Sequence, residues 1–346
     1  MASESKRTVL VALGANGVIA LAKLAAGLVS GSSSMLAEAA HSVADTLNQV
    51  FLLTSLKVSA RPADRDHPFG YGKAQFFWSF LAAVGIFVAG AVFSVYEGIH
   101  TLVSDSEEEV GLLIPYAVLG VSLAAEGVSW VRAVVQLRGE SRETGRSLFG
   151  HVRASKDPTA KTVLSEDTAA LLGILLAAAG IGLHYVTGSA VWDGAAAIAI
   201  GLLLAAVAFV LGRDTRDLLI GEAADPGLVV GVHDAISAYP EVTGVVELLT
   251  MHLGPSSVLV ALRVDLHDGL SAAQVEEWSE RAERDLCARW PDIRQLFLDP
   301  TRPDPERTER TKRHVDRLRG ERTQGEAAQG EAAQNHAAQS RAARAR

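Results

Sequence analysis

Long apolar stretches, separated by short polar connections, fill the chain up to about residue 213. Each approaches the roughly 20 apolar residues that a helix needs to cross a bilayer. Alanine and glycine are frequent within them, which suits close packing between helices in lipid. We therefore expect a six-helix transmembrane bundle over residues 8–213. The helices are expected at about 9–29, 33–56, 76–100, 111–135, 163–185 and 190–211.

The pattern changes after Arg213, where shorter segments alternate with turns. In chain order these predict a helix over 226–240, strands over 244–253 and 257–266, an amphipathic helix over 272–290 and a strand over 293–298. The order αββαβ predicts a small α+β domain with an antiparallel sheet over residues 214–300. Residues 301–346 are rich in charge and contain the repeat QGEAAQGEAAQ, so we expect a disordered tail without a packing face.

Lysine and arginine are unevenly divided among the connections between the apolar stretches. The second connection carries four of them and the fourth carries six, whereas the other three connections carry none. Because basic loops stay on the cytoplasmic side, both termini are expected in the cytoplasm. The composition and the absence of a targeting segment favour a multi-pass protein of a bacterial plasma membrane.

Composition and charge exclude several other classes of protein. Hydrophobic residues make up 49% of the chain, which is too many for a disordered protein. The lone Cys287 cannot form a disulfide within the chain. The formal net charge of −8 argues against a nucleic-acid partner. Neither a phosphate-binding glycine motif nor an ordered Ser/His/Asp set occurs, so we do not expect an enzyme with a resident cofactor.

Ionisable residues lie inside the apolar stretches, where they are costly and therefore candidates for function. His41 and Asp45 are four residues apart in the second stretch and share one helical face. Asp167 lies in the fifth stretch and supplies a third candidate ligand. Imidazole nitrogen and carboxylate oxygen suit Zn²⁺, Mn²⁺, Co²⁺ or Fe²⁺. Because the same groups bind protons, this set predicts exchange of a metal ion for protons.

The remaining polar residues of these stretches leave several roles open. Glu166 is a less certain ligand, because adjacent residues point about 100° apart on a helix and it cannot easily face the same ion as Asp167. Glu126 is a fourth ligand, a proton relay or a partner for Lys23. The alternative for the whole set is buried polar contacts that only hold helices together.

Four segments of the chain match the motifs of one family when they are taken together. They are GSSSMLAEAAHSVADTLNQ (31–49), RPADRDHPFGYGKAQ (61–75), EDTAALLGILLAAAGI (166–181) and AVWDGAAAIAIGLLL (190–204). With the six apolar stretches and the αββαβ order, they resemble the cation diffusion facilitator family of zinc-transporter-like cation efflux proteins. The resemblance covers about residues 8–300.

This resemblance implies a homodimer in the membrane that exports a divalent cation, usually Zn²⁺, from the cytoplasm in exchange for protons. The cation is the cargo of a secondary transporter, and no resident cofactor is implied. The transport site is expected between the second and fifth helices. The cytoplasmic domain is expected to have a ferredoxin-like, metallochaperone-like fold that pairs the subunits.

The sequence departs from the family pattern in three places, two of them metal-binding motifs and the third the strands of the cytoplasmic domain, where apolar residues stand in place of the histidines of some members. Val163 stands where many members carry a histidine four residues before Asp167, so the four-ligand site lacks one donor. In the loop after the second helix, Asp64 and His67 fit a further metal site, but Tyr71 replaces another histidine. The missing donor keeps two alternatives open, which are a transporter for manganese, iron or cobalt and a non-transporting metal sensor or scaffold.

Overall fold

The computed structural model describes residues 2–104, 112–143 and 158–321. The chain divides into two compact units, Met1–Leu219 and Ile220–Arg346, each with its own hydrophobic core. The boundary lies a few residues beyond the end that the hydropathy pattern predicts for the sixth apolar stretch.

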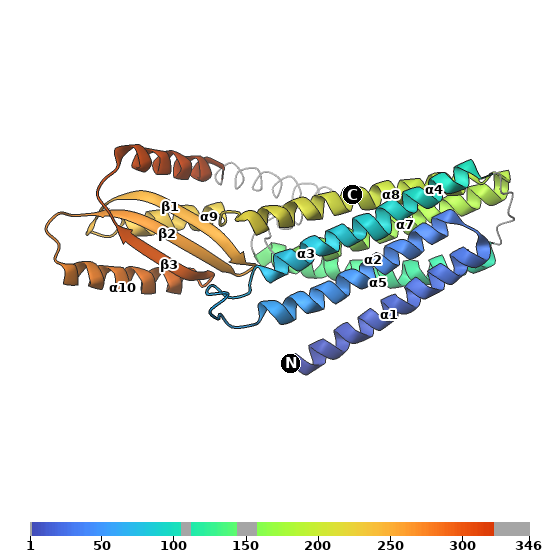
Figure 1. The fold of residues 1–346 in the computed structure, drawn as a ribbon, viewed down its shortest axis with the longest axis horizontal. Helices are drawn as coiled ribbons and strands as arrows, with labels where there is room; N and C mark the ends of the chain where they lie inside the picture. The colour runs from blue at the N-terminus through green and yellow to red at the C-terminus, as the bar shows by residue number, and fades with distance from the viewer. Residues whose placement is uncertain (1, 105–111, 144–157, 322–346) are drawn as a thin grey trace, which may run out of the picture. The chain divides into compact units, whose positions relative to one another are not determined.

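The first unit is a bundle of long helices. They are α1 (Ala2–Ser30), α2 (Ser33–Ser59), α3 (Ala74–Gly85), the π-helix η1 (Ile86–Val92), α4 (Phe93–Val103), α5 (Leu113–Glu143), α7 (Pro158–Thr187) and α8 (Val191–Ile220). Figure 1 shows α1 and α2 joined by a tight turn and running in opposite directions. Gly31 forms this turn with a φ of 67°, a left-handed conformation that favours glycine.

Five of these long segments are apolar enough to cross a membrane, as predicted. They are Leu13–Ser30, Ala74–Val103, Leu113–Gly139, Leu164–Thr187 and Val191–Ile220. In the described part of the chain α2 does not reach that hydropathy, so a sixth span stays a prediction. Its 27 residues are long enough to span, but they include buried polar residues such as Glu38, His41 and Asn48, which lower the average.

Small residues let the helices of this unit approach closely. A Cβ atom at Gly98 of α4 would lie 2.6 Å from the Gly194 carbonyl oxygen of α8, so the two backbones touch there. Many large apolar side chains, including Leu28, Val103 and Phe209, point outward instead. The unit thus has an alanine-rich apolar core and an apolar outer surface, as expected of a protein that lies in lipid.

The third apolar segment is not a uniform α-helix. Residues Ile86–Val92 form one π-helical stretch between α3 and α4. Within it, Gly90 packs against Leu204 of α8, where an added Cβ would meet the leucine side chain at 3.0 Å. The hydrophobic pattern gives no sign of this irregularity, because a π-turn changes the hydrogen bonding of a helix and not its composition.

The second unit contains the predicted order of elements around an apolar core. The elements are α9 (Pro226–Ser237), β1 (Val242–Gly254), β2 (Ser257–Leu266), α10 (Ala272–Arg289) and β3 (Ile293–Pro300). Trp278 and Ala282 of α10 are completely buried with Ile236 of α9 and Val260 of β2. Ser271 begins α10 with a capping box, because its hydroxyl and the Gln274 side chain satisfy each other's backbone N–H groups.

The prediction of a fully antiparallel sheet for this unit is wrong for one pair of strands. The strand order is β1-β2-β3, with β1 antiparallel to β2 but β2 parallel to β3. A parallel pair needs a long crossover connection, and α10 supplies it between β2 and β3. The three-stranded mixed sheet does not by itself establish the ferredoxin-like fold, which stays a prediction.

The disordered tail predicted from residue 301 is also wrong for the part that the structure describes. Residues 305–321 form a helix, whereas residues 322–346 lie outside the described residues. The Thr311 hydroxyl donates a hydrogen bond of 3.0 Å to the Val246 carbonyl of edge strand β1, and Val315 is buried. This helix has an apolar stripe after all, with Thr311, Val315 and Leu318 at helical spacing.

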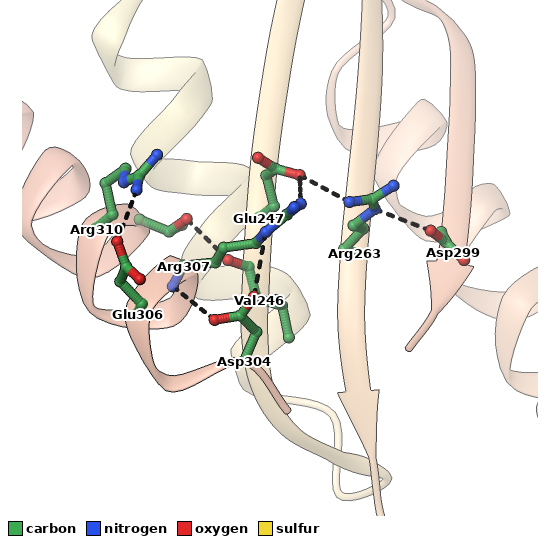
Figure 2. Close-up of polar contacts among 9 residues, drawn as sticks. Val246, Glu247, Arg263, Asp299, Asp304, Glu306, Arg307 and Arg310 are labelled. Atoms are coloured by element: carbon green, nitrogen blue, oxygen red, sulfur yellow. Dashed lines mark hydrogen bonds and ion pairs between the residues drawn. The ribbon is translucent and has the colours of Figure 1, made fainter. Parts of the chain in front are cut away.

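An ion-pair network connects this helix to side chains of all three strands of the sheet (Figure 2). Arg263 of β2 bonds Asp299 of β3 at 3.0 Å and Glu247 of β1 at 3.4 Å, and these three residues are direct cross-strand neighbours. Arg307 joins the same Glu247 at 3.3 Å. The helix is thereby attached to β1, which is an edge strand of the sheet.

Candidate metal site in the helical unit

The polar residues of α2 face the interior of the helical unit. Ser32 caps the helix by accepting a hydrogen bond from the Met35 N–H, which fixes where the helix begins. From that start, His41, Asp45 and Asn48 fall on one side at intervals of four and three residues. His41 and Asn48 are buried, and the Asp45 side chain is only 13% exposed.

His41 and Asp45 approach each other without completing a hydrogen bond. His41 Nε2 lies 3.5 Å from Asp45 Oδ2. Neither ring nitrogen of His41 has a hydrogen-bond partner in the described structure, and the same is true of Asp45 Oδ1. Buried polar atoms in proteins are nearly always satisfied, so such a set calls for an explanation. Imidazole nitrogen and carboxylate oxygen are donors that fit a divalent transition metal.

The two acidic residues of α7 point toward different neighbours. Both carboxylate oxygens of Glu166 accept hydrogen bonds from the Asn48 side-chain amide of α2, at 2.7 and 2.6 Å. Asp167 Oδ2 accepts a bond of 2.9 Å from the Ser129 hydroxyl of α5. This agrees with the expectation that adjacent helical residues do not face one ion. The Ser129 and Asn48 partners were not foreseen from the sequence.

The predicted ligands are only partly brought together. His41 and Asp45 form a close pair, while Asp167 and Glu166 are each held by another residue. Among the described residues, no group of three histidine, cysteine, aspartate or glutamate side chains is close enough to hold a metal ion. The complete ligand set therefore stays a prediction, with Glu126 half-buried on α5.

Lys23 of α1 pairs with Glu38 of α2 rather than with Glu126. The distance from Lys23 Nζ to Glu38 Oε2 is 2.9 Å, and both side chains are completely buried. The pairing considered between Lys23 and Glu126 is therefore wrong. Glu38 lies one helical turn before His41, so this ion pair adjoins the candidate site.

The first turn of α2 binds a buried carboxylate from α8, which sequence reasoning missed. Asp193 of α8 accepts hydrogen bonds from the Ser32 hydroxyl at 2.9 Å and from the Ser33 N–H at 2.6 Å. The Ser33 hydroxyl adds a bond of 3.1 Å, and the Ser34 hydroxyl also donates to it. Asp193 thereby satisfies the free N–H groups of the helix start and complements its dipole. The three consecutive serines were the available signal.

The loop between α2 and α3 places the other predicted metal ligands on the surface. Asp64 Oδ1 accepts from the His67 N–H at 2.8 Å, and Asp64 Oδ2 accepts from the Tyr71 hydroxyl at 2.7 Å. These hydrogen bonds, the Tyr71 bond foremost, lower the pKa of the Asp64 carboxyl. The His67 ring packs against the Tyr71 ring, with 4.2 Å between centroids and the ring planes tilted by 33°. These contacts order the loop, while metal binding by Asp64 and His67 stays a prediction.

Comparison with known proteins gives one family model and several related chains. A model described as the cation efflux transmembrane domain matches residues 9–220. The chain is 35% identical over 290 residues to the proton-coupled zinc antiporter SLC30A9, mitochondrial, of Xenopus laevis, covering 84% of this chain and 51% of that protein. The Homo sapiens protein of the same name is 34% identical over 259 residues, covering 75% of this chain and 45% of that protein.

A bacterial relative matches over nearly its whole length. The manganese efflux system protein MneP of Bacillus subtilis is 26% identical over 305 residues, covering 86% of this chain and 97% of that protein. By contrast, the chain spans about half the length of the SLC30A9 relatives.

Proposed function

The chain belongs to the cation diffusion facilitator (cation efflux) family and is a multi-pass membrane protein, and on that premise we propose that it exports a divalent metal cation from the cytoplasm in exchange for protons. The observation that carries the proposal is the buried pair of His41 and Asp45, in which both ring nitrogens and Asp45 Oδ1 have no hydrogen-bond partner in the described structure. Within a membrane, such atoms can be satisfied neither by lipid nor by bulk water. A metal ion from one side and protons from the other would satisfy them in turn.

The residues of the pair have defined roles in this exchange. The neutral imidazole of His41 and the ionised carboxylate of Asp45 bind the cation. Asp167 is the third ligand, and it must turn from Ser129 to reach the cation. Protons that arrive from the outer side then occupy the same atoms and displace the cation, because the cation and the proton compete for the same lone pair of each ligand atom. Rocking of the helices around the site would alternate its access.

Zinc is the first candidate for the cargo, and manganese is the second. Zinc is favoured by the imidazole of His41 and is the metal named for the SLC30A9 relatives. Manganese is favoured by Val163, since the loss of a histidine leaves an oxygen-rich ligand set. The MneP relative is named for manganese. Glu166 is a further oxygen donor that could join the site on release from Asn48.

The assembly and the setting of the transporter complete the proposal. The functional protein is a homodimer, paired through the second unit, with both termini in the cytoplasm. The basic connections before α3 and before α7 support this orientation. The proposed location is a plasma membrane. The SLC30A9 relatives are named as mitochondrial, so fractionation of the cells that make this chain tests the location separately.

Uptake into proteoliposomes under an imposed proton gradient tests the function. Zn²⁺, Mn²⁺, Fe²⁺ and Co²⁺ are compared for the wild-type chain, for Asp45→Asn and for Asp217→Asn. Asp217 is a surface residue at the end of α8, so its variant is a control of matched chemistry. Gradient-dependent zinc uptake that Asp45→Asn loses and Asp217→Asn keeps supports the proposal. Uptake of Mn²⁺ alone keeps the mechanism and replaces the metal. Metal binding without uptake of any ion contradicts it and favours a sensor.

A further inference from the structure

The ion pair between Lys23 and Glu38 has no place in the exchange described above. It joins α1 to α2 in the interior of the helical unit, with both side chains 0% exposed. A buried ion pair is weak evidence for stability, because the cost of removing both charges from water can exceed their attraction. An apolar pair would serve equally well to hold the helices together. Ionisable residues retained inside a membrane are candidates for function.

Only one of the two oxygens of the Glu38 carboxylate is bonded to Lys23. Its Oε2 atom accepts from Lys23, while its buried Oε1 atom has no hydrogen-bond partner in the described structure. Oε1 points to the backbone of α7 at Gly173, where an added Cβ atom would collide with it. The same helix carries Asp167. The unpartnered oxygen therefore lies between the two helices that carry the proposed ligands.

Glu38 also lies next to the candidate pair along α2. It precedes His41 by three residues, so the two side chains are neighbours on one face of α2. Asp45 follows His41 by four residues and completes the candidate pair. A second α2 carboxylate beside this pair would add an oxygen ligand and one negative charge to the site. Lys23 supplies the one positive charge that offsets it.

We propose that Lys23 determines the affinity and the metal preference of the site by keeping Glu38 paired and out of the ligand set. This inference rests on the proposed function. With Lys23 in place, the cation meets one imidazole and a limited number of carboxylates, and it can be released. Without Lys23, Glu38 becomes an additional oxygen ligand. The site then binds divalent cations more tightly and shifts toward Mn²⁺, which prefers oxygen donors.

Metal titration of the purified full chain in detergent tests this with a cycle of variants. Lys23→Met removes the charge at similar length, Glu38→Gln removes the carboxylate, and a third protein carries both changes. Lys23→Met is expected to bind Mn²⁺ about tenfold or more tightly than the wild type, with a smaller gain for Zn²⁺. Glu38→Gln is expected to weaken both metals by about tenfold, because Lys23 is then an uncompensated cation near the site. The double variant returns to within about threefold of the wild type.

Opposite signs for the two single variants separate this inference from a purely structural ion pair. Lys23→Arg keeps the charge and is expected to bind like the wild type. If Lys23→Met does not fold, Glu38→Gln and the double variant decide. A double variant that binds no more tightly than Glu38→Gln overturns the inference, and so do single variants that shift affinity in the same direction. Loss of binding in Asp45→Asn identifies the site being titrated. A wild-type chain that binds neither metal overturns the proposed function instead.

Discussion

The two ends of one buried polar stretch in α2 differ in how far their polar atoms are satisfied. At the first turn, Asp193 of α8 receives hydrogen bonds from the backbone and hydroxyl groups of three serines. Two to three turns further on, His41 and Asp45 are only 1% and 13% exposed but have polar atoms without hydrogen-bond partners. Both clusters lie on the same helix, so the contrast does not arise from different folds.

The contrast distinguishes polar residues that stabilise the helical unit from polar residues that bind the transported cation. A carboxylate with all its bonds made inside the protein stabilises one arrangement of α2 and α8. Buried polar atoms without hydrogen bonds cost free energy in the metal-free protein, and binding of a cation or a proton recovers that free energy. Substitution of Asp193 or its serine partners should therefore lower the stability of the fold, whereas substitution of His41 or Asp45 should impair transport.

Asp45→Asn should have the largest effect, and it acts on transport. The amide is neutral and a poorer ligand, so one charge and one donor are lost from the site. Residues that only orient metal ligands are worth about ten- to a hundredfold, so loss of a ligand should reduce uptake by more than about a hundredfold. Thermal unfolding of the purified variant should be unchanged. Normal uptake by Asp45→Asn would contradict the role of Asp45 as a metal ligand.

Asp193→Asn should act in the opposite way. The amide cannot accept all the bonds that the serines donate, so buried donors of α2 lose their partner. We expect a loss of about 2–3 kcal/mol in stability, measured by unfolding in detergent. Metal affinity of the folded fraction should stay within about threefold of the wild type. A variant of normal stability and impaired metal binding would reverse the roles assigned to the two ends.

Asn48→Ala should have an intermediate effect, because Asn48 lies beside the site but supports it indirectly. Its amide donates both bonds that Glu166 accepts, and the variant leaves that carboxylate unpaired. We expect about a tenfold fall in uptake, the effect typical of a residue that orients a ligand. Asn16→Ala on α1 is the control. Uptake equal to that of the control would show that Glu166 needs no fixed position.

Tyr71→Phe in the surface loop should have the smallest effect. Removal of the hydroxyl deletes the main cause of the lowered Asp64 pKa, so this pKa should rise toward its ordinary value. A carboxyl with a lowered folded-state pKa contributes stability above its unfolded pKa and loses it as the pH falls through the folded one. The variant should shrink this acid-sensitive contribution and leave uptake unchanged. Carboxyl titration by NMR measures the Asp64 pKa in the wild type and in the variant. An unchanged Asp64 pKa would contradict the role of the Tyr71 hydroxyl in lowering it.

Much of the fold could be predicted from the sequence, because hydrophobic length and periodicity are local properties. Six apolar spans and the αββαβ order were predicted in this way, and five of the spans and the order of elements are confirmed. The parallel pairing of β2 with β3 could not be predicted from alternation alone, since both directions give the same pattern. The helix over residues 305–321 was missed because charged residues obscure its narrow stripe of Thr311, Val315 and Leu318.

The candidate site was predictable only where its residues are close in sequence. The pair of His41 and Asp45 follows from helical spacing, and the divergence of Glu166 and Asp167 follows from their adjacency. The contacts of Ser129 with Asp167, of Lys23 with Glu38 and of Asp193 with the serines each join two helices, and nothing local in the sequence connects the partners. Such long-range pairs depend on how the helices are rotated in the bundle, which the hydrophobic pattern leaves open.

The assignment of His41 and Asp45 as metal ligands is tested most directly by zinc-edge X-ray absorption of the zinc-loaded protein. A site of one imidazole and several carboxylates should show light-atom ligands at about 2.0–2.1 Å with the scattering of a single imidazole ring. His41→Gln should lose the imidazole signal while the protein stays folded. An unchanged imidazole signal in His41→Gln would contradict the assignment, because the zinc would then lie elsewhere.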